Sequence, residues 1–329
     1  MSVPIPRADA FVEEHAAAIA EAHARIAPHV RRTPLLTTDL DAGLRCKPEC
    51  FQVTGSFKPR GAFNAILSLQ ARDPSVRGVI TTSSGNHAQA VALAARTAGL
   101  PAVILIPEGA TPSKIAATKG YGAEVIQEGV TFGNREERLR EVQEERGLEI
   151  VHPYDDWDIL HGAGTAAREA LEDEPGITTI VAPIGGGGLL SGTALAAKAH
   201  DPYLRVVGVE PEAADDAYRT LASGQIQTLA TAPDTMADGV RTMSIGTRNF
   251  EVLVTHGLAD AIVTVSEAEI AEATVSAWLR LKLALEPTGA LPLAAWLAGK
   301  VAPRPGPTLL LLSGGNANPE LVAGLLEGR

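Results

Sequence analysis

The sequence predicts an α/β protein built on an open, mostly parallel twisted sheet. β-rich runs alternate with helical stretches, and glycine- or serine-rich loops follow the carboxyl ends of several runs. Strand–helix–strand units of this spacing build parallel sheets with helices on both faces. The predicted strands are Val79–Thr81, Val103–Ile106, Glu124–Ile126, Thr179–Ala182, Val206–Val209, Ile262–Val265 and Leu309–Leu312. The predicted helices include His87–Ala98, Asn134–Arg146, Leu189–Ala199 and Glu267–Leu285.

One lysine stands out within the run Gln52–Ala62. Lys58 lies between an aromatic ring and a proline, in a short polar segment flanked by glycines. A lysine amine is a useful nucleophile only when its charge is suppressed and a carbonyl partner is held beside it. An isolated lysine in such a run is most often a solvated surface residue. Three further segments favour a functional lysine here, and they are Ser83–His87, Gly185–Leu189 and Ser313–Asn316.

The glycine run predicts an anion-binding loop. Ile180–Pro183 is typical of a buried strand, Gly185–Gly188 of a tight loop, and Leu189–Ala199 of the helix that follows. Successive N–H groups without side chains, together with the positive end of a helix, suit a phosphate.

Two other interpretations of this loop stay open. It could be a close-packed turn without a ligand. Gly186 and Gly188, with Glu210 ending the next strand, also resemble half of a dinucleotide-binding fingerprint. Ser191 stands where the third glycine of that fingerprint belongs, so the dinucleotide interpretation ranks second.

Composition limits the possible partners and compartment. The 329 residues carry a formal charge of −11, which argues against nucleic acid or an anionic membrane as a partner. The two cysteines, Cys46 and Cys50, lie in one segment and suggest reduced thiols in a cytoplasmic protein. We see no signal peptide, and the longest apolar runs are too short to cross a bilayer.

Taken together, these segments resemble the signature of the fold-type II pyridoxal-phosphate enzymes, in the branch of threonine/serine dehydratases and serine racemases. The resemblance extends from about Thr33 to Asn316. It implies a large pyridoxal-phosphate-binding domain made of residues 1–69 and 157–329, and a smaller inserted α/β substrate-binding domain at 70–156. It also implies a homodimer or homotetramer.

The resemblance assigns roles around pyridoxal 5′-phosphate. Lys58 would hold the cofactor covalently, Phe57 would pack on one ring face, and Asn86 would hydrogen-bond its 3′-oxygen. Ser313 would hydrogen-bond the pyridine nitrogen, and a neutral hydroxyl there favours prompt loss of a β-substituent over transamination. Turn chemistry and core packing are the simpler explanations for Asn86 and Phe57. The full cofactor-binding set is Phe57, Lys58, Asn86, Gly185, Gly186, Gly187, Gly188, Leu189 and Ser313.

The substrate would bind at the start of the helix near His87. The loop before it offers N–H and hydroxyl groups at a helix N-terminus, where the resemblance places the α-carboxylate of an amino acid. His87 is assigned carboxylate positioning, although a lone histidine is more often structural. Arg135 could face a second carboxylate. The substrate-binding set is Ser83, Ser84, Gly85, His87 and Arg135.

Ser84 is the second expected catalytic residue, beside Lys58. Related threonine dehydratases usually have alanine at this position, whereas serine racemases and some hydroxyamino-acid dehydratases have serine. In racemases this hydroxyl faces the substrate from the side opposite the lysine and returns a proton to Cα. Racemisation therefore stays open.

The acidic run Glu210–Asp216 resembles the divalent-cation site of the racemase-like branch. Residue by residue, the ligands of Mg²⁺ or Ca²⁺ would be Glu210, the carbonyl of Ala214, and Asp216, completed by waters. A solvated acidic turn that caps the next helix is the simpler alternative.

The chain departs from the family pattern in Leu160–Thr165, where relatives usually carry Ala-Gly-Gln-Gly-Thr. Ala163 therefore lacks an amide and His161 is larger than usual, which would alter side-chain preference if this stretch borders the pocket. Only about a dozen residues follow Asn316. We therefore expect no isoleucine feedback through an appended C-terminal domain.

The resemblance implies a threonine/serine dehydratase, or ammonia-lyase. L-threonine would give 2-oxobutyrate and ammonia, as in isoleucine biosynthesis, and L-serine would give pyruvate and ammonia. Lys58 would take the Cα proton. The alternatives are a serine racemase or a threo-3-hydroxyaspartate dehydratase and, more distantly, a nucleotide-binding module without this chemistry.

Overall fold

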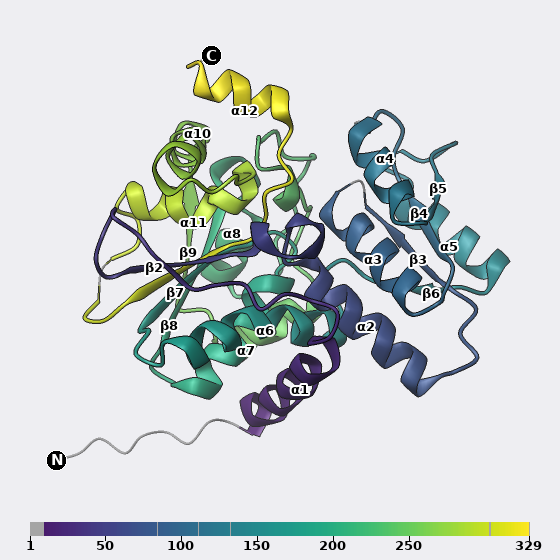
Figure 1. Ribbon diagram of the computed structural model, residues 1–329, viewed down its shortest axis with the longest axis horizontal. Helices are drawn as coiled ribbons and strands as arrows, with labels where there is room; N and C mark the ends of the chain where they lie inside the picture. Colours follow the sequence, from purple (N-terminus) through teal and green to yellow (C-terminus); the bar gives the residue numbers. More distant parts are fainter. Residues whose placement is uncertain (1–9, 84, 111, 132, 303, 329) are drawn as a thin grey trace.

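The computed structural model describes residues 10–83, 85–110, 112–131, 133–302 and 304–328. The described strands are β1 Leu36–Thr37, β2 Leu44–Pro48, β3 Val79–Thr82, β4 Ala102–Leu105, β5 Glu124–Ile126, β6 Glu149–Ile150, β7 Thr179–Pro183, β8 Arg205–Pro211, β9 Ala261–Val265 and β10 Thr308–Leu312. They form a six-stranded sheet in the order β1-β2-β10-β7-β8-β9 and a four-stranded sheet in the order β5-β4-β3-β6. In Figure 1 the four-stranded sheet lies to the right of the six-stranded one.

The strand pairings confirm the predicted fold class. Every pairing among the described strands is parallel except that of β1 with β2. All seven predicted strands are present, with ends that differ by one or two residues, the usual uncertainty of such boundaries. The sequence did not predict β1, β2 and β6.

Helices cover both sheets (Figure 1). The described α-helices are α1 Ala10–Ile26, α2 Lys58–Arg72, α3 Asn86–Thr97, α4 Pro112–Gly120, α5 Arg135–Arg146, α6 Trp157–Asp173, α7 Gly188–His200, α8 Asp216–Ser223, α9 Thr247–Phe250, α10 Glu267–Ser276, α11 Pro287–Leu297 and α12 Pro319–Leu326. The short 3₁₀ or π segments are η1 Glu49–Phe51, η2 Val53–Gly55, η3 Glu212–Ala214, η4 Asp238–Val240, η5 Glu251–Thr255 and η6 Ala277–Leu281.

The predicted helix Glu267–Leu285 was too long. The α-helix α10 starts with a capping box between Ser266 and Glu269 and ends at Ser276, where it widens into the π-helix η6. Lys282 then takes a left-handed conformation with φ 58°, which no α-helix tolerates in its interior. No glycine or proline marks this end, so the sequence lacks the usual stop signal.

The hydrophobic core follows the alternation of side chains along the strands. Ile180 and Ala182 of β7 pack with α6 and α7 on one face of the six-stranded sheet. Val181 packs with α11 on the other face. In the four-stranded sheet, Ile104 faces α2 and α3, whereas Leu105 faces α5. Each sheet is therefore buried on both faces, as parallel sheets are.

The four-stranded sheet lies wholly within residues 70–156, the segment expected to form the inserted domain. The exact domain bounds stay a prediction. Among the described helices, none is long and apolar enough to cross a membrane.

Candidate active site

Lys58 is the first residue of α2, which carries a proline in its first turn. The fixed φ of proline suits this position. The N–H of Phe57 donates to the carbonyl oxygen of Ser313 at 3.0 Å, and Ser56 forms an isolated antiparallel bridge with Gly314. The start of α2 is therefore attached to the loop that follows β10, as the sequence-based site requires.

The amine of Lys58 is held inside the protein. Its Nζ donates to the carbonyl oxygen of Pro153 at 2.8 Å and lies 5.1 Å from the ring centroid of Phe57. Burial lowers the pKa of Lys58 to about 8, and the charge of Glu286 opposes this shift. An appreciable fraction of the amine is therefore neutral near physiological pH, which a nucleophile and a general base both need.

The glycine loop joins β7 to α7, as predicted. Gly187, with φ +103°, precedes the first residue of α7. Among the described residues, the amides of Gly185, Gly186 and Gly187 donate to no other backbone carbonyl. The first N–H groups of a helix also have no intrahelical partner. The loop therefore presents several free donors at the positive end of α7, which suits an anion.

Tyr154 covers this loop, and the sequence analysis did not identify it. A Cβ at Gly186 would lie 2.2 Å from Cγ of Tyr154, so only glycine allows the ring to pack there. Asn249 Nδ2 donates to the Tyr154 carbonyl at 3.0 Å, and the Tyr154 N–H donates to His152 Nδ1 at 3.2 Å. The residues come from segments far apart in the chain, so no local pattern could have revealed the contact.

The loop before α3 forms another side of the site. The N–H of Ser83 donates to the Leu105 carbonyl at 3.2 Å, and the N–H of Gly85 donates to Ser83 Oγ at 3.3 Å. A Cβ at Gly85 would meet nothing within 4 Å, so this glycine borders open space. Ser84 lies outside the described residues. Asn86 begins α3, one residue earlier than predicted.

His87 is buried, with a side chain 3% exposed. Its Nε2 contacts the Val151 carbonyl oxygen at 3.1 Å. Burial, followed by the nearby charge of Lys58, lowers the pKa of His87 to about 3. A neutral ring that donates from Nε2 has only a lone pair at Nδ1. Because a lone pair cannot donate a hydrogen bond to a carboxylate, this arrangement favours a structural role for His87. Carboxylate positioning by His87 stays a prediction.

The remaining residues expected around the cofactor surround Lys58 or the glycine loop. Ser313 follows β10 directly and is 3% exposed, and Leu189 is a buried residue in the first turn of α7. Asn86 Nδ2 donates to Glu286 Oε1 at 2.8 Å. Glu286 is itself buried and was not identified from the sequence. It precedes the first helical residue, a proline, of α11, and its side chain makes no capping hydrogen bond.

Arg135 begins α5, beside the four-stranded sheet. Its side chain is 29% exposed, and its Nε lies 3.8 Å from Glu136 Oε1. Burial raises the pKa of Tyr154, and the charges of Glu136 and Arg135 reach its hydroxyl with opposite effects. Binding of a second carboxylate by Arg135 stays a prediction.

The acidic turn contains two buried carboxyl groups. Glu210 and Asp216 are each 1% exposed. Burial raises the pKa of Glu210 to about 9, with the charge of Asp216 adding to the shift, and raises the pKa of Asp216 to about 7. Glu210 Oε1 accepts the Tyr218 N–H at 2.6 Å. Asp216 Oδ2 has no hydrogen-bond partner among the described residues.

Burial of both carboxyl groups argues against a solvated turn, and their oxygens are ligands that a hard cation accepts. Ala214, whose carbonyl is the expected third protein ligand, ends η3 and is 1% exposed. No cluster of three or more His, Cys, Asp or Glu residues of metal-binding geometry occurs in the described part of the chain. The expected set contains only two such side chains, so the metal site stays a prediction.

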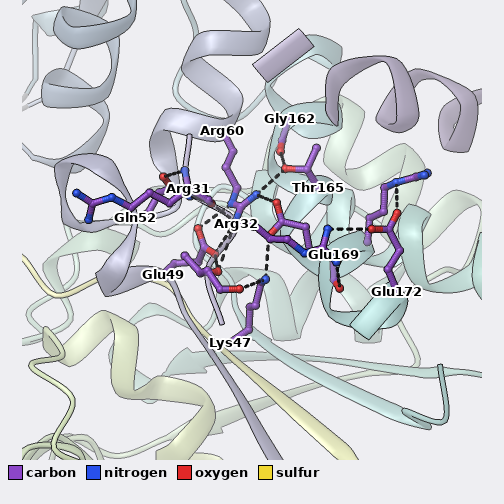
Figure 2. Close-up of polar contacts among 12 residues, drawn as sticks. Arg31, Arg32, Lys47, Glu49, Gln52, Arg60, Gly162, Thr165, Glu169 and Glu172 are labelled. Carbon is purple, nitrogen blue, oxygen red and sulfur yellow. Dashed lines mark hydrogen bonds and ion pairs between the residues drawn. The ribbon is translucent and has the colours of Figure 1, made fainter. Parts of the chain in front are cut away.

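A buried ion-pair network anchors the helix that carries Lys58 (Figure 2). Arg60 Nε contacts Glu49 Oε2 at 2.8 Å, and its Nη1 contacts Glu169 Oε1 at 2.7 Å. Lys47 Nζ contacts Glu169 Oε2 at 2.8 Å, and Thr33 Oγ1 donates to Glu49 Oε1 at 2.7 Å. All four charged side chains are at most 2% exposed. The network joins α2 to η1 and α6, so it limits where Lys58 can lie.

The departure from the family pattern on α6 faces another helix. His161 Nε2 lies 2.8 Å from His15 Nδ1 of α1, and the two rings pack with Trp157. Ala163 is fully buried in the core that α1, α6 and α7 share. The larger residue at position 161 therefore packs against the N-terminal helix.

Comparison with known proteins identifies the family to which these residues belong. A family model described as "Pyridoxal-phosphate dependent enzyme" matches residues 26–314. A serine racemase of Arabidopsis thaliana is 43% identical over 310 residues, which is 91% of this chain and 92% of that protein. An L-threo-3-hydroxyaspartate ammonia-lyase of Saccharomyces cerevisiae is 40% identical over 319 residues, 94% of this chain and 96% of that protein.

Solved structures show the same architecture. The crystal structure of a threonine deaminase of T.th. superposes with a TM-score of 0.86 at 47% sequence identity, and the alignment covers 92% of this chain and 98% of that chain. The family match spans the lysine, the glycine loop and the strand-end serine. The chain therefore belongs to the pyridoxal-phosphate-dependent enzymes, as a fold-type II member of the threonine/serine dehydratase and serine racemase branch.

Proposed function

We propose that the protein is an L-threonine/L-serine ammonia-lyase, which converts L-threonine to 2-oxobutyrate and ammonia, and L-serine to pyruvate and ammonia. The observation that carries the proposal is the amine of Lys58, held 2.8 Å from the Pro153 carbonyl with its pKa lowered to about 8. Elimination from an L-amino acid needs a base on one face only. Lys58 supplies that base.

The residues present fit pyridoxal phosphate. Free amides at Gly185, Gly186 and Gly187, at the start of α7, suit its phosphate. The partly neutral amine of Lys58 suits its aldehyde, and the Ser313 hydroxyl, at the end of β10, suits its pyridine nitrogen. When bound, the cofactor withdraws electrons from the substrate and makes the Cα proton acidic.

The chain's own residues then perform binding and proton transfer. The substrate carboxylate would bind at the N-terminus of α3, where Gly85, whose N–H donates to Ser83 Oγ, borders open space. The amine of Lys58 takes the Cα proton. The β-hydroxyl accepts a proton and leaves as water, and hydrolysis returns that water and releases ammonia and the 2-oxo acid. The ring of Tyr154 packs on the glycine loop and covers Gly186.

Serine racemisation and dehydration of threo-3-hydroxyaspartate are the second candidates. Ser84 favours racemisation because its hydroxyl could return a proton to the face opposite Lys58. Arg135 favours a substrate with a second carboxylate. The relatives named above include a protein of each kind. The nucleotide-binding alternative has no support, because the matching family is one of pyridoxal-phosphate enzymes.

An assay panel of L-threonine, L-serine, D-serine and threo-3-hydroxyaspartate tests the proposal in the wild type and in Ser84→Ala. We expect wild-type 2-oxobutyrate release from L-threonine to exceed D-serine formation. Ser84→Ala should suppress conversion of L-serine to D-serine by roughly 10²-fold or more, the usual contribution of a general acid. It should leave L-threonine dehydration largely intact.

Two outcomes contradict this account of Ser84. Wild-type racemisation in Ser84→Ala would show that its hydroxyl is not the acid. Loss of both substrate binding and threonine turnover would instead make Ser84 a carboxylate ligand. A wild type that forms D-serine but no 2-oxobutyrate would overturn the proposed lyase activity itself.

We further propose that Glu210, Asp216 and the Ala214 carbonyl bind Mg²⁺ or Ca²⁺. Chelation should lower the melting temperature or the threonine turnover, and Mg²⁺ should restore it, because a bound cation would stabilise the ionised form of two buried carboxyl groups whose pKa values burial raises. The double change Glu210→Ala, Asp216→Ala should remove this response. If the melting temperature and the activity stay unchanged in a protein verified to be free of metal, the acidic turn is only a helix cap.

The assembly as a homodimer or homotetramer, the cytoplasmic location and a place in isoleucine biosynthesis all stay predictions. Size-exclusion chromatography with light scattering measures the first directly.

A further inference from the structure

Asn316 ends the segment Ser313–Asn316, and the proposed mechanism gives it no task. Its Nδ2 donates two hydrogen bonds, to the Thr54 carbonyl at 2.7 Å and to Asn86 Oδ1 at 2.8 Å. Asn86 Nδ2 in turn donates to Glu286 Oε1 at 2.8 Å. A continuous row of hydrogen bonds thus joins four segments that are distant in the sequence and meet beside Lys58.

The groups at the two ends determine the direction of this row. The Thr54 carbonyl and the Glu286 carboxylate can only accept hydrogen bonds. Asn316 must therefore present its nitrogen, and both hydrogens of that nitrogen are used. Asn86 must place its oxygen toward Asn316 and its nitrogen toward Glu286. A reversed Asn86 amide would set two nitrogens against each other at one end and two oxygens at the other.

Glycines allow the row to assemble. Gly55, at φ +74°, would carry a Cβ only 2.6 Å from Asn316 Oδ1. A Cβ at Gly314 would lie 2.8 Å from Glu286 Oε1. The backbone also ties these segments together, since the Gly315 N–H donates to the Gly55 carbonyl at 2.9 Å. The close approach of Asn316 and Glu286 to Asn86 is therefore built into the backbone.

We propose that Asn316 and Glu286 are positioning residues that hold the Asn86 amide in one orientation, with its nitrogen available to the cofactor. The amide nitrogen of Asn86 carries two hydrogens. Glu286 accepts one of them, and the other serves as the donor to the 3′-oxygen of pyridoxal phosphate. This inference rests on the proposed function, because the role of Asn86 toward the 3′-oxygen belongs to that proposal.

The direct test is Asn316→Asp, which replaces the donating nitrogen with an acceptor. The Asn86 amide then lies between two carboxylates, so its nitrogen no longer has a single preferred orientation. We expect pyridoxal phosphate to bind roughly tenfold more weakly, the loss of one hydrogen bond. The bound cofactor should also shift from visible to ultraviolet absorption, because a donor at the 3′-oxygen stabilises its anionic form. The melting temperature of the apoprotein should fall, since the row now contains opposed acceptors.

A second variant separates positioning from stability. In Asn316→Asp, Glu286→Gln, the new amide at position 286 can donate to a reversed Asn86, and Asn86 can donate to the new carboxylate, so only the Thr54 carbonyl stays without its donor. The melting temperature of the apoprotein should recover in part, whereas the visible band and the cofactor affinity should not. Glu286→Gln alone keeps the orientation of Asn86 and should keep the visible band.

Asn318→Asp is the matched control. It makes the same charge change two residues further on, where Asn318 Oδ1 accepts the Glu320 N–H at 2.9 Å as the cap of α12. Aspartate caps a helix equally well, so the band, affinity and melting temperature should stay unchanged. Asn316→Ala removes the donor without adding an acceptor, so Glu286 alone still orients Asn86 and the visible band should weaken less than in Asn316→Asp.

Two results would overturn the inference: a wild-type band in Asn316→Asp, or recovery of the band together with the melting temperature in the double variant. Failure of the proposed function is a different result. If the visible band of the variants changes as expected but the wild type does not turn over L-threonine, the proposed orientation of Asn86 is supported and the proposed substrate is wrong.

Discussion

Replacing Lys58 with alanine should abolish both threonine turnover and the visible absorption of bound pyridoxal phosphate. The variant loses the amine that holds the cofactor covalently and the base that takes the Cα proton. Loss of the base alone should lower the turnover rate by at least roughly 10²-fold to 10⁴-fold. Absorbance of the purified protein and a 2-oxobutyrate assay measure the two effects separately.

The wild type offers a pH test of the same amine. Only the neutral form attacks an aldehyde, and burial lowers the pKa of Lys58 to about 8. The rate at which apoprotein takes up pyridoxal phosphate should therefore rise with pH and level off above about 8. Lys119→Ala, at an exposed lysine of α4, should change neither the rate nor the band. Full turnover in Lys58→Ala would refute the assignment.

Arg60→Met should destabilise the apoprotein by about 3–5 kcal/mol, because it leaves Glu49 and Glu169 buried with a charge partner removed. Burial lowers the pKa of Arg60, but the two glutamates outweigh this effect and raise it, so the guanidinium stays charged at any pH that the fold survives. A shift of the urea-unfolding midpoint measures the loss of stability.

Arg72→Met is the matched control on the same helix. Arg72 Nη1 contacts Asp158 Oδ2 at 2.8 Å, but the arginine side chain is 61% exposed. Exposed pairs contribute about 0–1 kcal/mol, so this variant should unfold close to the wild type. Equal unfolding midpoints for Arg60→Met and Arg72→Met would mean that the buried network does not hold α2 in place.

The fold was predictable wherever a strand carries its signal in local hydrophobicity. β2 was missed because it contains Arg45 and Lys47, which no local rule places in a buried strand. Lys47 is fully buried because its partner Glu169 lies on α6, far along the chain. β6 is only two residues long, Glu149–Ile150. The helix predicted to begin at Glu267 was too long for a different reason. Its end depends on the left-handed conformation of Lys282, and no glycine marks that position in the sequence.

The candidate site was predictable where a motif carries its own chemistry, as at Lys58 and the glycine loop. Tyr154 was missed because its contact with Gly186 joins two loops that lie far apart in the sequence. Glu286 was missed because it belongs to none of the motifs that point to the site. Its bond to Asn86 joins residues 200 positions apart. Contacts between residues so far apart in the chain depend on the topology of the two sheets, so they cannot be predicted from one sequence.

The most direct test of the account is to find which lysine carries the cofactor. Borohydride reduction of the purified wild-type protein should fix the bound pyridoxal phosphate to its lysine, and peptide mass mapping then locates it. We expect one pyridoxyl group per chain, on the peptide that contains Lys58. A label on another lysine, or no label in a protein that converts L-threonine to 2-oxobutyrate, would contradict the central role of Lys58.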